Sequence, residues 1–70
     1  MTYTYTGVVD EITALKIEDS EIEVTFKGHG TYKINQFEYG RIYCALKQMQ
    51  VGQKVLVATH YGYLKWVKPR

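Results

Sequence analysis

The stretch Gln36–Gln50, QFEYGRIYCALKQMQ, is the one segment with helical periodicity, and it interrupts a series of strand-like runs. Its apolar side chains recur every three or four positions, which places them on one face of a helix. They are Tyr39, Ile42, Tyr43, Leu46 and Met49. The opposite, polar face carries Arg41, Cys44, Lys47 and Gln48. The stretch therefore predicts an amphipathic helix that packs one face against the rest of the chain.

The flanks of this stretch carry signals for the two helix ends. Asn35 is expected to cap the start, with Glu38 three residues later as in a variant of the capping box, and Gly52 suits the left-handed position after the end. Gly40 would then lie inside the helix, at a cost of about 1 kcal/mol relative to alanine. Packing must therefore hold the element in place.

Three strand-like runs precede the helix. Residues 3 to 17 are expected to form one long, curved strand, because Gly7 interrupts the run where a bulge or bend is easy. A slip of one residue turns every side chain to the other face, so the pairing should match apolar residues. A turn at Asp19 and Ser20 does this by pairing Ile17 with Ile22 and Leu15 with Val24. The result is a three-stranded meander.

The second hairpin has a glycine-rich loop. If Gly28, His29 and Gly30 form a three-residue loop, Phe26 pairs with Tyr32 and Gly30 supplies the positive φ that such loops require. The same register pairs Val24 with Ile34 and Thr25 with Lys33. His29 is then a loop-tip residue.

Two runs after the helix, residues 54–60 and 63–68, predict a closing hairpin around Tyr61 and Gly62. The expected pairs on one face are Val57 with Trp66 and Thr59 with Leu64. The other face would carry Leu56, Ala58, His60, Tyr63, Lys65 and Val67. Because so small a domain needs its largest side chain inside, this register makes Trp66 a core residue.

Length and composition limit the class of protein. Seventy residues suffice for one domain, and 46% hydrophobic with 23% charged residues is typical of globular proteins. No apolar run approaches the roughly 20 residues of a spanning helix, and the first seven residues do not resemble a signal peptide. We therefore expect a soluble, cytoplasmic protein. Cys44 is the only cysteine, so neither an internal disulfide nor a zinc site is expected, and no cofactor is implied.

The order of the elements is that of a β-rich α+β domain, three strands, a helix and two strands. Over nearly the whole chain this order resembles the OB-fold, a small five-stranded barrel. An SH3-like barrel and an open antiparallel sheet packed on one helix are the alternatives.

The resemblance implies an oligonucleotide or oligosaccharide site on the face of the second and third strands. The outward positions there are Glu21, Glu23, Thr25, Lys27, Thr31, Lys33 and Asn35. This face has two carboxylates and no aromatic ring, whereas single-strand binders need rings and cations. It therefore departs from the usual pattern.

Charge is divided unevenly between the two halves of the chain. Residues 1–35 hold three lysines and six carboxylates, whereas residues 36–70 hold six basic residues and one carboxylate. The last hairpin interleaves rings with positive charge, and it supplies the candidate binding residues. They are His60, Tyr61, Tyr63, Lys65, Lys68 and Arg70.

Two functions fit these patterns, and neither is enzymatic. The first is a non-catalytic module that binds single-stranded nucleic acid, with Lys and Arg on phosphates and Tyr61 or Tyr63 stacked on bases. The second is a protein-interaction module or small regulatory subunit, including a homodimer, to which Tyr3 and Tyr5 on an edge strand would contribute. Glu21 and Glu23, the nearest to an acid and base pair, are expected on an open strand face with no pocket.

Overall fold

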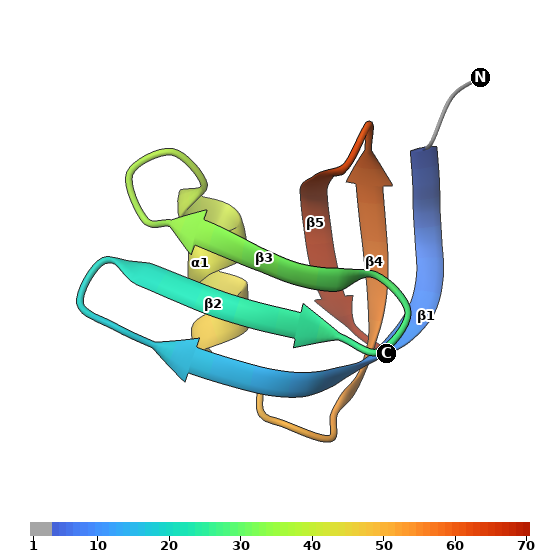
Figure 1. The fold of residues 1–70 in the computed structure, drawn as a ribbon, viewed down its shortest axis with the longest axis horizontal. Coiled ribbons are helices and arrows are strands. Elements are labelled where there is room, and N and C mark those ends of the chain that lie inside the picture. The colour runs from blue at the N-terminus through green and yellow to red at the C-terminus, as the bar shows by residue number, and fades with distance from the viewer. Residues whose placement is uncertain (1–3) are drawn as a thin grey trace.

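A computed structural model describes residues 4–70, with side chains from residue 7 onward, as five antiparallel strands in one sheet and one helix (Figure 1). The elements are β1 (Thr4–Ile17), β2 (Glu21–Phe26), β3 (Gly30–Asn35), α1 (Gly40–Lys47), β4 (Lys54–His60) and β5 (Tyr63–Pro69). This confirms the expected element order. The sheet order is β3-β2-β1-β4-β5, so β3 and β5 are its two edges and the sheet is not closed.

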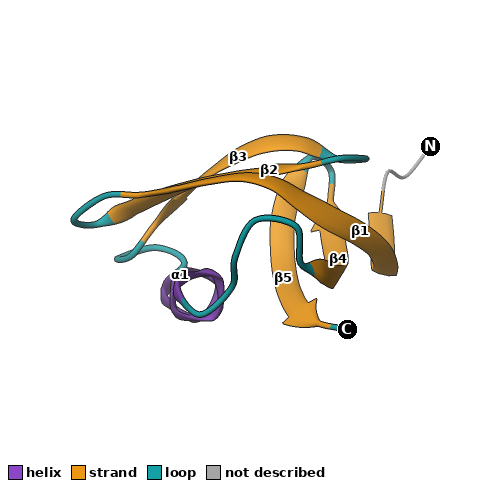
Figure 2. Ribbon diagram, turned by 90° about the horizontal axis from the view of Figure 1, so that it is seen from below, coloured by secondary structure: helices purple, strands orange, loops and turns teal. Residues whose placement is uncertain are grey.

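Strand β1 joins the two parts of the sheet. Its first half pairs with β4 and its second half, from Ile12 to Ile17, pairs with β2. A bulge between Tyr5 and Val8 contains Gly7 at a φ of 67°, as expected for a bend in a long strand. Figure 2 shows the consequence: β2 and β3 cross the top of the view, β4 and β5 descend from it, and α1 lies in the angle between them. Tyr3 lies outside the described residues.

The core fills this angle. From α1 and the residues after it, Ile42, Tyr43, Leu46 and Met49 are buried, as the helical stripe predicts. From the sheet, the buried side chains are Ile12, Ile22, Val24, Phe26, Ile34, Val55, Val57, Leu64 and Val67. The polar residues predicted opposite the stripe are all exposed. No helix within residues 4–70 is long and apolar enough to cross a membrane.

The helix is shorter than its apolar stripe. It begins at Gly40, so this glycine occupies the first turn and not the interior, and Tyr39 is the N-cap residue without a side-chain cap. Asn35 does not cap α1. Its side-chain oxygen accepts a hydrogen bond from the Phe37 amide at 2.7 Å, and its carbonyl accepts one from the Tyr39 amide at 2.8 Å. Asn35 therefore stabilises the turn before the helix. Gly52 has a φ of 91°, in the later turn that leads to β4.

The predicted β1–β2 register is correct, with Ile17 opposite Ile22 and Leu15 opposite Val24. The predicted β2–β3 register is wrong by two residues. Phe26 lies opposite Gly30, and Val24 lies opposite Tyr32. The loop still has three residues, but they are Lys27, Gly28 and His29. A shift of two leaves the same side chains on the core face, so the apolar pattern does not distinguish the two registers.

The predicted pairing of the closing hairpin is correct beside the turn and wrong further along the strands. Tyr61 and Gly62 both have positive φ, 49° and 82°, which is the backbone of a type I′ turn. Thr59 lies opposite Leu64 as predicted. The register then shifts, so that Trp66 faces Ala58 and Val57 faces Val67. The intervening Lys65 is the extra residue of a bulge. Val67, not Trp66, is therefore the core residue, and Trp66 is only partly buried.

Candidate functional site

The six predicted binding residues lie at different points along the β4–β5 hairpin. His60 and Tyr63 face each other beside the turn, and Tyr61 is in the turn itself. Lys65 follows at the bulge. Lys68 and Arg70 lie toward the opposite end of β5, where the Arg70 amide donates to the Lys54 carbonyl at 3.3 Å. They are therefore not one continuous cluster.

A basic hollow of about 440 Å³ brings two of them together with a helix residue. Its lining residues are Arg41, Ile42, Lys65, Trp66, Val67 and Lys68. Arg41 comes from the first turn of α1, which packs beside the β5 edge. Three cations therefore share one concave surface, and none of the described residues that line it is acidic. Such a surface attracts anions.

The Lys65 bulge determines where Trp66 and Lys68 lie. Without the extra residue, Trp66 would face Val57 and the core. Instead the tip of its ring lies beside Gly7 on β1, where a methyl group added to this glycine would make an ordinary van der Waals contact with the ring at 3.8 Å. The Lys68 ammonium lies 4.6 Å from the ring centroid, a cation–π contact. Trp66 thus holds one of the three cations of the basic hollow.

A second hollow, of about 310 Å³, adjoins the first, because Lys65 lines both. We call it the tyrosine hollow. Its lining residues are Tyr39, His60, Tyr63, Leu64 and Lys65. Leu64 is buried, and Tyr63 is 69% exposed, so a ligand can reach the Tyr63 ring. Tyr39 packs against the core from the segment before α1.

Four of the six predicted residues thus line the two hollows, and two do not. The rings of Tyr61 and His60 are nearly perpendicular, with centroids 4.4 Å apart, and Tyr61 lines neither hollow. Arg70 lies outside both as well. Sequence reasoning missed Arg41 and Tyr39 as site residues. The helical pattern places Arg41 on the polar face, but only the packing of α1 beside β5 brings it to Lys65.

The face implied by the OB resemblance is covered by polar pairs across strands. Glu23 lies opposite Lys33. The hydroxyl groups of Thr25 and Thr31 share a hydrogen bond of 2.8 Å. These pairs leave the face without a concentration of positive charge. The two hollows are the better candidate site.

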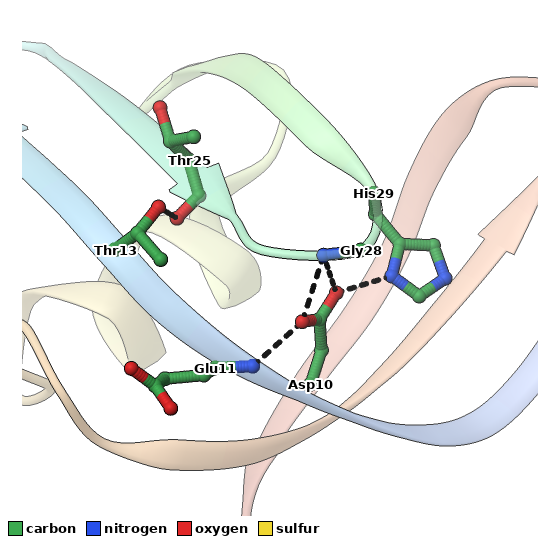
Figure 3. A network of polar contacts seen from close by, with 6 residues as sticks. All are labelled: Asp10, Glu11, Thr13, Thr25, Gly28 and His29. Carbon is green, nitrogen blue, oxygen red and sulfur yellow. Dashed lines mark hydrogen bonds and ion pairs between the residues drawn. The ribbon is translucent and has the colours of Figure 1, made fainter.

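A separate polar cluster lies where β1 meets the β2–β3 loop (Figure 3). The Asp10 carboxylate accepts hydrogen bonds from the Glu11 amide at 2.7 Å, the Gly28 amide at 3.0 Å and Nδ1 of His29 at 2.5 Å. Asp10 is 8% exposed. Burial disfavours its charged form, but the bonds from His29, Glu11 and Gly28 outweigh burial and lower the pKa of Asp10.

We call the hydrogen bonds from Glu11, Gly28 and His29 to Asp10 the Asp10 clasp, and we interpret their role as structural. A methyl group on Gly28 would come within 3.2 Å of the carboxylate, so the loop backbone fits closely around Asp10. The His29 side chain is only 12% exposed, so His29 is anchored and is not the simple loop-tip residue that the sequence predicts.

The Asp10 charge also affects Tyr32 on β3. Burial of the Tyr32 ring and the negative charge of Asp10 both disfavour the phenolate form of Tyr32, and together they raise its pKa.

Metal-ligating groups are dispersed. Among the described residues, no three His, Cys, Asp or Glu side chains lie close enough together to hold a metal ion. Cys44 is a free thiol on the exposed face of α1.

Comparisons of the chain with protein-family models, curated proteins and solved structures give no match. Inference about function therefore depends on the residues and their geometry.

Proposed function

We propose that the chain is a non-catalytic module that binds single-stranded nucleic acid along the β5 edge, beside the start of α1. The basic hollow carries this proposal, because Arg41, Lys65 and Lys68 line it together and no described lining residue is acidic. Like charges held close together repel one another, and a polyanion relieves that repulsion while releasing its own counterions. Nucleic-acid phosphates supply the matching charge.

Aromatic rings beside the cations favour a nucleic acid over a small inorganic anion. Tyr63 is 69% exposed, and with Tyr39 it lines the hollow next to the cations. Proteins that bind single strands combine a positive groove for the backbone with aromatic rings for the bases. Both parts are present, in two hollows that share Lys65.

For the fold, we propose an OB-like barrel, in which the edge strands β3 and β5 approach each other. Closing the sheet would bring together its two edge strands, β3 and β5. Nuclear Overhauser contacts between backbone protons of β3 and β5 would support closure, and their absence in an otherwise assigned spectrum would favour an open sheet packed on one helix.

For the location, we propose the cytoplasm. Cys44 is exposed and is the only cysteine of the chain. A free, exposed thiol is better suited to a reducing compartment than to an oxidising one. Labelling of Cys44 in intact cells with a thiol reagent that does not cross membranes would contradict this proposal.

The test is an amide NMR titration of the whole chain with a mixed-sequence single-stranded oligonucleotide, at low and at high salt. We expect shifts concentrated in β5, the first turn of α1 and the β4–β5 turn, and we expect them to weaken steeply with salt. Affinity that does not change with salt would contradict binding through phosphates.

Matched variants locate the contact. Lys65→Gln removes a cation of the basic hollow, and it should reduce the magnitude of the slope of log affinity against log salt by about 0.7, the value for one phosphate contact on a single strand. Lys33→Gln makes the same change at an exposed position of β3, outside both hollows, and should leave the slope unchanged. Equal effects of the two variants would mean that the phosphates bind lysines over the whole surface and not the basic hollow in particular.

A protein-interaction module is the second candidate, supported by exposed apolar side chains that line neither hollow. Val9 is 46% exposed, Val51 59% and Phe37 83%. The edge strands β3 and β5 could also accept a further strand. Sedimentation over a range of concentrations tests the homodimer form of this idea, and a monomer at every concentration would exclude it.

A further inference from the structure

The two hollows differ in chemistry, although Lys65 belongs to both. The basic hollow holds three cations around Trp66, whereas the tyrosine hollow is lined mainly by rings and Leu64, with Lys65 as its one lysine or arginine among the described residues. The first suits phosphates. The second suits a flat, largely apolar group that is attached to them.

We infer that the tyrosine hollow binds one unpaired nucleobase, whose neighbouring phosphates bind Lys65 and Arg41. This inference rests on the proposed function and adds to it the part of the ligand that each hollow takes. The volume, about 310 Å³, is at the lower end of the range of roughly 300–1,000 Å³ for small-ligand sites. A hollow of this volume has room for a nucleobase.

The rings make this hollow a stacking site. Tyr63 offers an exposed ring, while Tyr39 packs against the core and Leu64 is 5% exposed, so the latter two provide a firm support for a base. A base in a duplex is covered by its neighbours on both faces and cannot enter. The hollow thus selects unpaired strands.

The geometry also distinguishes between the two tyrosines of the hairpin. Tyr63 lines the hollow, whereas Tyr61 lies outside it with its neighbour His60 against its ring. Tyr63 is therefore the stacking residue, although both rings are exposed.

The experiment compares two probes on the whole chain, a mixed-sequence single-stranded oligonucleotide and an abasic oligonucleotide with the same backbone and length. We expect the intact strand to bind about tenfold more tightly, which is within the range for stacking of one base. The Leu64 methyl signals should shift with the intact strand and not with the abasic strand, because only a base brings a ring current to the hollow.

Variants then assign the difference to one residue. Tyr63→Leu should reduce binding of the intact strand to the level of the abasic strand, and the exposed position of Tyr63 makes misfolding easy to avoid. Tyr61→Asn, which tolerates the positive φ of the turn, should keep the tenfold preference. Amide spectra of both variants verify the fold.

Two results would overturn the inference in different ways. Equal, salt-sensitive binding of both probes would remove the base site and leave the proposed nucleic-acid function intact. No binding of either probe at low salt would remove the proposed function, and the base site with it.

Discussion

Nδ1 of His29 donates a hydrogen bond of 2.5 Å to the carboxylate of Asp10, although the two residues are 19 positions apart in the chain. Asp10 lies on β1 between the bulge at Gly7 and a second register shift, between Ile12 and Ala14. His29 lies in the loop between β2 and β3. The bond therefore attaches the tip of the β2–β3 hairpin to β1 where the sheet bends. The Gly28 amide, bonded to both carboxylate oxygens at 3.0 Å, strengthens this attachment.

Replacing the clasp carboxylate should destabilise the fold. Asp10→Asn removes the charge and turns an amide NH₂ toward one of the present donors, so we expect a loss of about 2 kcal/mol in the free energy of unfolding. Urea unfolding measures it. The control is Asp19→Asn, the same change in the exposed β1–β2 turn, which should cost less than about 0.5 kcal/mol. Equal losses in the two variants would mean that the hydrogen bonds of Asp10 stabilise the fold no more than an exposed carboxylate does.

The clasp also predicts sensitivity to acid. The pKa of Asp10 is below its ordinary value of 3.8 in the folded chain, because the effect of burial is outweighed by the bonds from His29, Glu11 and Gly28. Its contribution to stability is therefore present above the unfolded pKa and is lost as the pH falls through the folded one. A hydrogen bond from Lys54 lowers the pKa of Glu11, which acts in the same direction.

Urea unfolding at several pH values tests this dependence. The free energy of unfolding should decrease as the pH falls below about 4, and it should decrease less in Asp10→Asn, which has no carboxyl to protonate. Identical pH profiles for the two proteins would contradict the assignment to Asp10.

Two glycines should respond oppositely to the same substitution. Gly62→Ala places a side chain at a φ of 82° in the β4–β5 turn, so we expect a loss of about 1 kcal/mol. Gly40→Ala acts in the first turn of α1, where the added methyl group meets nothing within 4 Å, and we expect a gain of up to about 1 kcal/mol. Thermal unfolding measures both. A stabilised Gly62→Ala would refute the type I′ turn.

The contact between Lys68 and Trp66 should be visible in fluorescence. Lys68→Met keeps most of the aliphatic stem and removes the ammonium 4.6 Å from the ring centroid. We expect a shift of Trp66 emission and a loss of no more than about 1 kcal/mol, as for other exposed cation–π pairs. Unchanged emission would mean that Lys68 spends little time over the ring, and would leave it freer to bind phosphate.

Much of the fold follows from local pattern. The alternation in β2 predicts its buried face, and the stripe that includes Ile42 and Leu46 predicts the buried side of the helix. The turns at Asp19 and at Tyr61 follow from matching apolar residues across them. These features depend on neighbours within a few residues, and therefore short-range periodicity determines them.

The candidate site could be predicted only in part. The interleaving of rings and cations along β5 indicates Tyr63, Lys65 and Lys68, but the same pattern includes Tyr61 and Arg70, which line neither hollow. Which of these residues share a hollow depends on the bulge in β5 and on the position of α1 beside that strand.

By itself, then, the sequence determined the order of the elements, their core faces and the two tight turns. Tertiary structure alone decided the β2–β3 register, the outward position of Trp66 and the meeting of Asp10 with His29. The reason is physical. A shift of two residues in strand pairing leaves every side chain on the same face of the sheet. One bulged residue moves the side chains that follow it to the opposite face. A hydrogen bond between residues far apart in the chain produces no periodic pattern in the local sequence. Such choices depend on long-range packing and hydrogen bonds, which form only when the whole chain is folded.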